Sequence, residues 1–180
     1  MNFLEDPDAR LMAEVVAGNL DALEQLVIRH QKSAWSFAYR FLGNAPDAED
    51  VVQEAFLRIF RAAPRYRPAA QFRTYLFGVV GNLCKDRLSK KRTVALEEAA
   101  SLPDPRPDAG RMLEIRERAI AVRRALDALP ARQRLALVLR HYEGLSYDEI
   151  AGALRIGAKA VDSLLQRARR TLQELLSDLK

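Results

Sequence analysis

The stretch LSYDEIAGALRIGAKAVDSLLQRARR, residues 145–170, decides the fold of this chain. Ser146 stands three residues before Glu149, and this capping-box spacing predicts a helix that begins at Tyr147. Gly157 then interrupts the apolar spacing, and a second helix follows. Two helices joined by a tight turn are typical of a helix-turn-helix unit, whose second helix enters the major groove of DNA.

Small and apolar residues occupy the positions at which such a helix pair must pack. Ala151 supplies a small residue where the second helix crosses the first. Leu154, Ile156 and Val161 supply apolar side chains on both sides of the turn. Arg155 holds the position just after the first helix, where glycine is often found. The pattern therefore fits a helix-turn-helix with one departure.

The outward side of the second predicted helix carries side chains that can reach base edges and phosphates. A solvated helix face with scattered charge is the alternative, because helix pairs of this spacing are common. The arginines at 167, 169 and 170 favour DNA. The candidate DNA-contacting residues are Lys159, Asp162, Ser163, Gln166, Arg167 and Arg170.

Apolar residues recur at intervals of three and four through most of the remaining sequence, as in helices with one buried face. Residues 93–112 break this pattern with three prolines and several carboxylates, which indicates a flexible linker. The sequence therefore predicts an all-α fold with two small helical domains, residues 1–92 and 113–180. In the first helix after the linker, the residues expected to face inward are Ile115, Ala119, Val122, Leu126 and Leu129.

Composition excludes several classes of protein. Of the 180 residues 49% are hydrophobic, which is enough for a packed core, and the net charge of +5 permits a polyanionic partner. One cysteine, Cys84, and two histidines, His30 and His141, cannot form a disulfide framework or a zinc cluster. We expect Cys84 in the core, and no metal ion or cofactor.

The sequence contains no phosphate-binding loop, no nucleophile beside a base and no paired carboxylates of a catalytic cleft, so we expect no enzyme activity. Residues 1–10, MNFLEDPDAR, are acidic where a signal peptide is basic and then apolar. The longest aliphatic run, LALVL, is too short to span a membrane. We therefore expect a cytoplasmic protein.

Two longer stretches resemble a known family in the same order. DAEDVVQEAFLRIFRAAPRYRPAAQFRTYLFGVVGNLCKDRLSKKR, residues 47–92, resembles region 2 of the extracytoplasmic-function sigma factors of bacterial RNA polymerase. ALPARQRLALVLRHYEGLSYDEIAGALRIGAKAVDSLLQRARRTLQELL, residues 128–176, is similar to their region 4. The resemblance implies a protein that binds core RNA polymerase, directs it to promoters and helps to open the minus-ten element.

The resemblance implies that the helix after residue 47 docks on core polymerase. Leu57 is an apolar residue among charges on the side away from the buried stripe, as in a partner-binding anchor. A solvated face is the alternative. The docking residues are then Asp50, Gln53, Glu54, Leu57 and Arg61.

The resemblance also assigns residues 64–71 to the minus-ten reading loop, where unpaired bases need cationic side chains and aromatic platforms. Phe72 is expected in the core. The basic end of the following helix then contacts the adjoining duplex, although the helix dipole alone favours cations there. The implied minus-ten residues are Arg65, Tyr66, Arg67, Tyr75, Asn82, Lys85, Arg87, Lys90, Lys91 and Arg92.

In region 4 the second helix of the pair would read the minus-thirty-five element. Asp162, Ser163 and Arg167 align with base-reading positions, and Arg167 is the strongest candidate for a base contact. Asp162 and Leu164 depart from many relatives, so the promoter sequence does not carry over, and Leu164 is expected in the core. The resemblance further implies control by an anti-sigma factor that covers both DNA-binding domains.

Two alternatives remain at this point. An ordinary helix-turn-helix repressor or activator would bind a palindromic operator as a dimer, without polymerase. A helical adaptor with basic faces would bind acidic proteins and show no salt-dependent binding of DNA.

Overall fold

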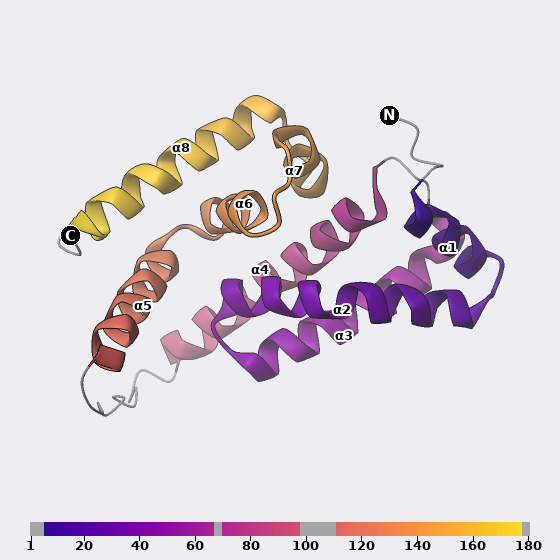
Figure 1. Cartoon of the computed structure of the whole chain (residues 1–180), viewed down its shortest axis with the longest axis horizontal. Helices are drawn as coiled ribbons and strands as arrows, with labels where there is room; N and C mark the ends of the chain where they lie inside the picture. The colour runs from indigo at the N-terminus through magenta and orange to yellow at the C-terminus, as the bar shows by residue number, and fades with distance from the viewer. Residues whose placement is uncertain (1–5, 67–69, 98–110, 178–180) are drawn as a thin grey trace.

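All of the secondary structure in the described residues is helical, as the sequence predicts (Figure 1). The computed structural model describes residues 6–66, 70–97 and 111–177, with side chains described outside 91–97 and 111–116. None of the described helices is long and apolar enough to cross a membrane. The elements are α1 (Pro7–Val16), α2 (Leu20–Leu42), α3 (Ala45–Ala62), the 3-10 helix η2 (Ala63–Arg65), α4 (Phe72–Glu97), α5 (Arg111–Ala128), α6 (Ala131–His141), α7 (Tyr147–Leu154) and α8 (Ala158–Leu175).

Side-chain caps set the starts of several helices. The side chain of Asn19 accepts backbone N–H bonds at the start of α2, and Asn44 does so at the start of α3. At α7 the predicted capping box is confirmed: the Glu149 N–H donates to Ser146 Oγ at 3.2 Å, and the Ser146 N–H donates to Glu149 Oε2 at 2.7 Å. These bonds satisfy N–H groups that have no partner within their own helices.

In the turn between α7 and α8, Arg155 stands where helix-turn-helix proteins often have glycine. Arg155 ends α7 with φ of 53°, and it is the one described residue other than glycine with a positive φ. A left-handed residue at this position is a common helix ending, and glycine adopts it without steric cost. The backbone therefore has the conformation that favours glycine, while the residue present carries a long cationic side chain.

A single contiguous core joins the two halves of the chain. Helices α1–α4 surround Phe37, Phe41 and Phe77, and the same cluster continues into Leu135 of α6 and Ile150 of α7. Helix α7 lies against α4, and α6 lies against α2 (Figure 1). A smaller cluster at the other end of the second half holds Leu126, Leu129, Leu137 and Ala168. The predicted domains are therefore packed directly on each other.

Three predictions of buried residues are confirmed. Phe72 is fully buried, and Leu164 is partly buried against the core. Cys84 is also fully buried, and burial raises the pKa of its thiol to about 12. A thiol in this environment stays protonated at neutral pH and packs as a small apolar side chain.

Two expectations for the middle of the chain need correction. Helix α4 continues to Glu97 and α5 begins at Arg111, so helix extends into both ends of the predicted linker 93–112; residues 98–110 lie outside the described part. Residues 93–97 contain no proline, and Ala95, Leu96 and Glu97 are good helix formers, which is compatible with the extension. Ala119 and Val122 are exposed, because only the last turns of α5 reach a buried cluster.

Candidate functional site

Helix α8 presents its predicted DNA-contacting side chains to solvent. Lys159, Ser163 and Arg167 are exposed, and their polar atoms bond along the helix: Ser163 Oγ donates to the Lys159 carbonyl at 3.0 Å, and Arg167 Nε donates to the Ser163 carbonyl at 3.1 Å. Asp162 accepts a bond from the Gln166 amide at 2.9 Å, so this carboxylate orients a polar neighbour. Val161, Leu165 and Ala168 are buried on the opposite side. The helix therefore separates a packing face from a polar face, as the prediction requires.

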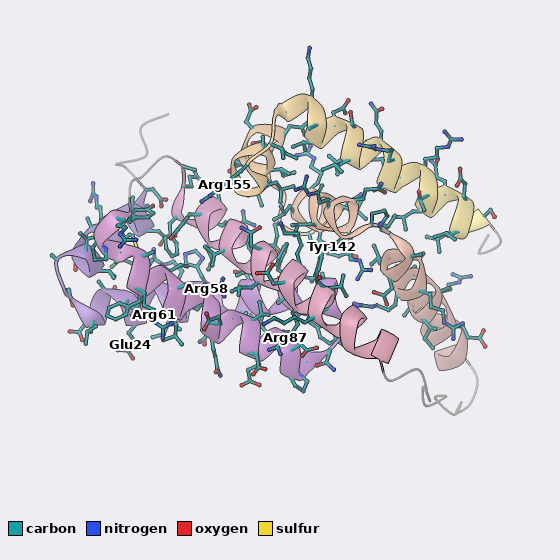
Figure 2. The ribbon with its side chains drawn as sticks, turned by 180° about the vertical axis from the view of Figure 1, so that it is seen from behind. Glu24, Arg58, Arg61, Arg87, Tyr142 and Arg155 are labelled. Carbon is teal, nitrogen blue, oxygen red and sulfur yellow. The ribbon has the colours of Figure 1, made fainter. Side chains whose placement is uncertain are left out.

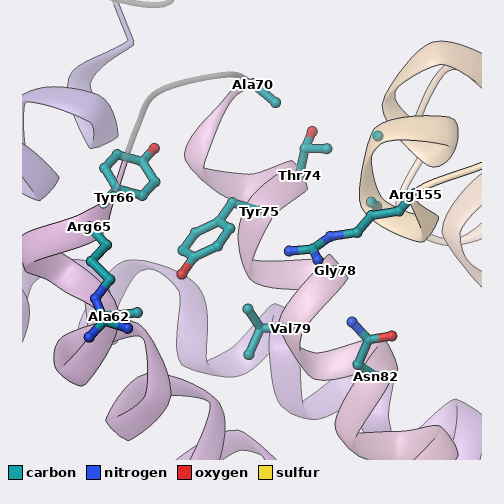
Figure 3. A pocket seen from close by; sticks show the side chains of 12 residues that line it. Ala62, Arg65, Tyr66, Ala70, Thr74, Tyr75, Gly78, Val79, Asn82 and Arg155 are labelled. Atoms are coloured by element: carbon teal, nitrogen blue, oxygen red, sulfur yellow. The ribbon is translucent and has the colours of Figure 1, made fainter.

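Four of the predicted minus-ten residues line one pocket of about 470 Å³ (Figure 3). Arg65 and Tyr66 come from η2 and the residue after it, and Tyr75 and Asn82 come from α4. The ring centroids of Tyr66 and Tyr75 lie 5.2 Å apart at 54°. The structure thus brings two aromatic rings and a guanidinium to one concave surface; Arg67 lies outside the described residues.

Two polar residues that line this pocket were not predicted from the sequence. Thr74 is 2% exposed, and its hydroxyl has no hydrogen-bond partner among the described residues. Arg155 reaches from α7 toward Tyr75 and Gly78 of α4, so the second half of the chain forms one wall of the pocket (Figure 3). No local sequence signal could have found Arg155, because it comes from the other half of the chain.

The two phenols of the pocket are neutral at physiological pH. Burial raises the pKa of Tyr75, and the charge of Arg155 lowers it by a smaller amount. Burial also raises the pKa of Tyr66, and the carboxylates of Asp6 and Asp8 raise it further. Both hydroxyl groups can therefore donate as well as accept a hydrogen bond. Two aromatic rings with neutral phenol groups suit an unpaired base.

The basic end of α4 is only partly free. Arg87 Nη2 contacts Asp50 Oδ2 at 2.7 Å, and Arg87 Nε lies 3.8 Å from Asp47 Oδ1, so Arg87 ties α4 to α3. The sequence placed Arg87 and Asp50 on two different surfaces, whereas they form one ion pair. Lys85 is partly exposed and Lys90 is exposed. The side chains of the remaining predicted residues, 91 and 92, are outside the description.

The predicted docking face on α3 is exposed. Leu57 is 48% exposed, and Gln53 and Arg61 are also exposed. Glu54 accepts a bond from Arg58 Nε at 2.7 Å, which lowers the pKa of its carboxyl. Figure 2 shows Arg58 and Arg61 on the side of the molecule that also carries Arg87. The face is therefore an apolar anchor surrounded by charge.

An apolar groove next to Leu57 was missed. The groove has a volume of about 420 Å³ between α2 and α3 and includes Phe60, which is 39% exposed. Gln53, Leu57 and Phe60 are spaced by four and three residues, so they form a second stripe beside the buried one. This spacing in the sequence could have predicted the groove-facing stripe. The residues that line the groove are Leu23, Val27, Gln31, Val52, Gln53, Phe56, Leu57 and Phe60.

Polar contacts hold the two halves together beside the pocket. Arg73 of α4 donates to the Glu143 carbonyl at 2.5 Å and lies 3.2 Å from the Glu143 carboxylate, which is buried. A Cβ on Gly78 would lie 3.0 Å from the Ala153 carbonyl oxygen, so α7 approaches α4 as closely as a glycine allows. These contacts keep α7 over the pocket.

A second set of contacts joins α6 to α2. Arg134 is 3% exposed, and its Nη1 donates to the Phe41 carbonyl and to Asp127 Oδ1, both at 2.9 Å. Burial lowers the pKa of Arg134, and the charge of Asp127 opposes this effect. The guanidinium of Arg40 lies 4.5 Å from the centroid of the Tyr142 ring. The closed arrangement therefore depends on buried polar contacts as well as on apolar packing.

Comparison with known proteins identifies the family. The model described as Sigma-70 region 2 matches residues 26–94, and that described as Sigma-70, region 4 matches residues 111–172. The ECF RNA polymerase sigma factor SigM of Mycobacterium tuberculosis is 37% identical over 175 residues, which are 97% of this chain and 87% of SigM. The ECF RNA polymerase sigma factor SigE of Mycolicibacterium smegmatis is 32% identical over 160 residues, which are 86% of this chain but 61% of SigE.

A solved structure has the same fold. The structure of CnrH in complex with the cytosolic domain of CnrY superimposes with a TM-score of 0.72 at 30% identity, covering 95% of this chain and 97% of that one. The region 2 match contains the pocket residues from Ala62 to Asn82, and the region 4 match contains the pocket wall from α7 and most of α8. The resemblance seen in the sequence is confirmed, and the chain belongs to the extracytoplasmic-function (ECF) family of RNA polymerase sigma factors.

Proposed function

We propose that this chain is an alternative sigma factor that binds core RNA polymerase, directs it to specific promoters and helps to open the minus-ten element. The observation that carries the proposal is the exposed polar face of α8, which lies in the segment that matches region 4. An adaptor for acidic proteins does not need neutral hydrogen-bonding side chains such as Ser163 and Gln166 between its cations. A reader of base pairs does.

Three surfaces divide the work in this proposal. The outer face of α8 reads the minus-thirty-five element as duplex DNA. The pocket that contains Tyr66 and Tyr75 takes an unpaired base of the minus-ten element, and Lys85 and Lys90 meet nearby phosphates. Leu57 and Phe60 dock on an apolar site of core polymerase. The protein performs no catalysis of its own and needs no cofactor.

Promoter opening requires the two halves to separate. The pocket is closed on one side by α7, through Gly152, Ala153 and Arg155, and a DNA strand cannot occupy the same space. Polymerase binding would supply the free energy for separation, since it can engage both halves at different sites. An anti-sigma factor would act in the opposite direction by holding the halves so that DNA and polymerase surfaces are covered. The protein would work in the cytoplasm, where polymerase and promoter DNA are found.

Transcription from fragmented genomic DNA tests the proposal. Purified core polymerase with this protein should start RNA at discrete sites that share paired upstream motifs, and these starts should be absent without the protein. Leu57→Ala removes an interface anchor, so the free energy of binding to core polymerase should weaken by about 1–2 kcal/mol. The loss should be visible as reduced co-elution. Ile28→Ala, at an exposed residue outside the groove lining, is the control. Normal co-elution of both variants without any RNA starts would favour a different role.

A further inference from the structure

The residue that precedes helix α1, Asp6, carries a carboxylate that accepts N–H bonds at the starts of two helices. Asp6 Oδ1 accepts the N–H of Asp8 at 3.1 Å, which is the N-cap of α1 itself. Asp6 Oδ2 accepts the N–H of Phe72 at 3.2 Å, across 66 positions of sequence. Phe72 is the first residue of α4, so its N–H has no partner within its own helix. The start of α1 is thereby joined to the start of the helix that carries Tyr75.

The next carboxylate joins α1 to α2. Asp8 is 8% exposed, and its Oδ2 lies 2.6 Å from His30 Nε2, while Oδ1 contacts the Arg29 guanidinium. His30 is also 8% exposed. A carboxylate removed from water in this way is stable only with partners of this kind. Promoter reading does not by itself explain this buried pair.

A row of rings leads from this buried pair into the pocket. The His30 and Phe72 centroids lie 5.3 Å apart, and those of Phe72 and Tyr75 lie 6.4 Å apart. The ring centroids of Tyr75 and Tyr66 lie 5.2 Å apart. The carboxylates of helix α1 lie close enough to Tyr66 that their charge raises the pKa of its phenol. The buried pair and the pocket are thus parts of one packed unit.

We propose that Asp6, Asp8 and His30 form a brace that positions Tyr66 and Tyr75 for capture of the minus-ten base. The brace residues line no part of the pocket, so they are positioning residues and do not touch DNA. Two preorganised rings lose less conformational freedom on binding than two mobile ones. The inference rests on the proposed minus-ten role of the pocket, and it adds α1 as the element that holds the pocket in shape.

A matched pair of cap variants tests the brace. Asp6→Ala removes the cap of α1 and the bond to Phe72, whereas Asn19→Ala removes the cap of α2 and an exposed bond to Glu14, with no contact to α4. The protein is assembled with core polymerase, and its affinity is measured for a forked DNA that exposes the minus-ten strand mapped from its own transcripts. A minus-thirty-five duplex and core polymerase itself are titrated in parallel. A melting temperature for each variant reports the general cost of losing a cap.

The brace predicts a selective loss. Asp6→Ala should weaken forked-DNA binding about tenfold, because a charge-assisted hydrogen bond is lost, and leave duplex and core affinities unchanged. Asn19→Ala should lower the melting temperature by a similar amount and change none of the three affinities. Equal forked-DNA affinity for wild type and Asp6→Ala would overturn the brace. So would an equal loss in Asn19→Ala.

A second variant and a spectroscopic measurement keep the brace separate from the proposed function. His30→Gln retains a hydrogen-bond donor for Asp8 but removes the ring against Phe72, and it should also weaken forked-DNA binding selectively. With 3-fluorotyrosine incorporated, the fluorine signals of Tyr66 and Tyr75 should shift or broaden in Asp6→Ala and His30→Gln, and stay fixed in Asn19→Ala. If wild type binds no forked DNA, the minus-ten role fails, and these spectra alone decide on the brace. Unchanged spectra would then reject it.

Discussion

The two proposed DNA-reading surfaces of this molecule are in opposite states. The outer face of α8 is exposed, and its hydrogen bonds run within the helix. The pocket with Tyr66 and Tyr75 has a wall made by α7 of the other half. On the function proposed above, the duplex-reading face is open to solvent, whereas the pocket for the melted strand is bounded by the other half of the chain. We therefore propose that the contact between the halves controls access of the minus-ten strand to the pocket.

The largest effect is expected from Arg134→Ala, which breaks the contact between α6 and α2. The carbonyls of Phe41 and Asp127 would lose a charged donor, so the free energy of unfolding should fall by about 3 kcal/mol. Because the Phe41 bond spans the two halves, binding of a forked minus-ten DNA to the free protein should rise relative to duplex binding. Chemical denaturation and DNA titration measure the two quantities.

Arg132→Ala is the matched control for this variant. Arg132 lies two residues away on the same helix and is exposed, so its removal should leave both quantities within error. If Arg134→Ala reduced duplex binding through α8 as strongly as it changed forked-DNA binding, the two surfaces would not be independent. The comparison drawn above would then be wrong.

An intermediate effect is expected from Arg167→Ala, which acts on the exposed surface alone. Loss of a base contact should cost about 1–3 kcal/mol of specific binding and relax the preference at one base pair. Forked-DNA binding without a minus-thirty-five element should not change. Titration of duplexes substituted at each position measures the preference. Arg169→Ala, at an exposed arginine outside the candidate set, should leave the preference as in wild type, and an unchanged profile for Arg167→Ala would reject its role.

Local features of this fold were predictable from sequence, and long-range ones were not. The capping box at Ser146 and Glu149 involves groups three residues apart, so spacing alone locates it. The helical stripes likewise placed Phe72 and Cys84 in the core. The sequence does not show how the two halves pack against each other. The position of Arg155 in the pocket therefore could not be inferred.

The same distinction applies to the candidate site. The face of α3 around Leu57 follows from helical periodicity, and the spacing to Phe60 would have extended it. The Phe72 N–H donates to Asp6 across 66 positions of sequence. Every residue except proline has a backbone N–H, so this partner could not be recognised from the pattern of side chains. The ion pair between Arg87 and Asp50 was also not predicted, because it joins two helices through tertiary packing. The DNA contact of Arg87 stays a prediction.

The smallest effect is expected from Gly78→Ala, and it probes the contact between α4 and α7 most directly. The added Cβ would lie 3.0 Å from the Ala153 carbonyl oxygen, whereas a Cβ on Gly152 meets nothing within 4 Å. Both changes replace glycine in a helix interior, which favours the helix by about 0.5–1 kcal/mol in each case. Only Gly78→Ala should push the halves apart, at a cost near the lower end of overpacking, about 1 kcal/mol.

A loss of that size in the stability of the closed arrangement should be measurable as a change in affinity for DNA. Free protein with Gly78→Ala should bind forked minus-ten DNA about fivefold more tightly than Gly152→Ala, because less free energy is spent in opening the pocket. Duplex binding through α8 should be equal in the two variants. Equal forked-DNA affinities would mean that α7 yields to an added methyl group without opening. The control of minus-ten access would then rest on the contacts of Arg134 and Arg73 and not on the close approach at Gly78.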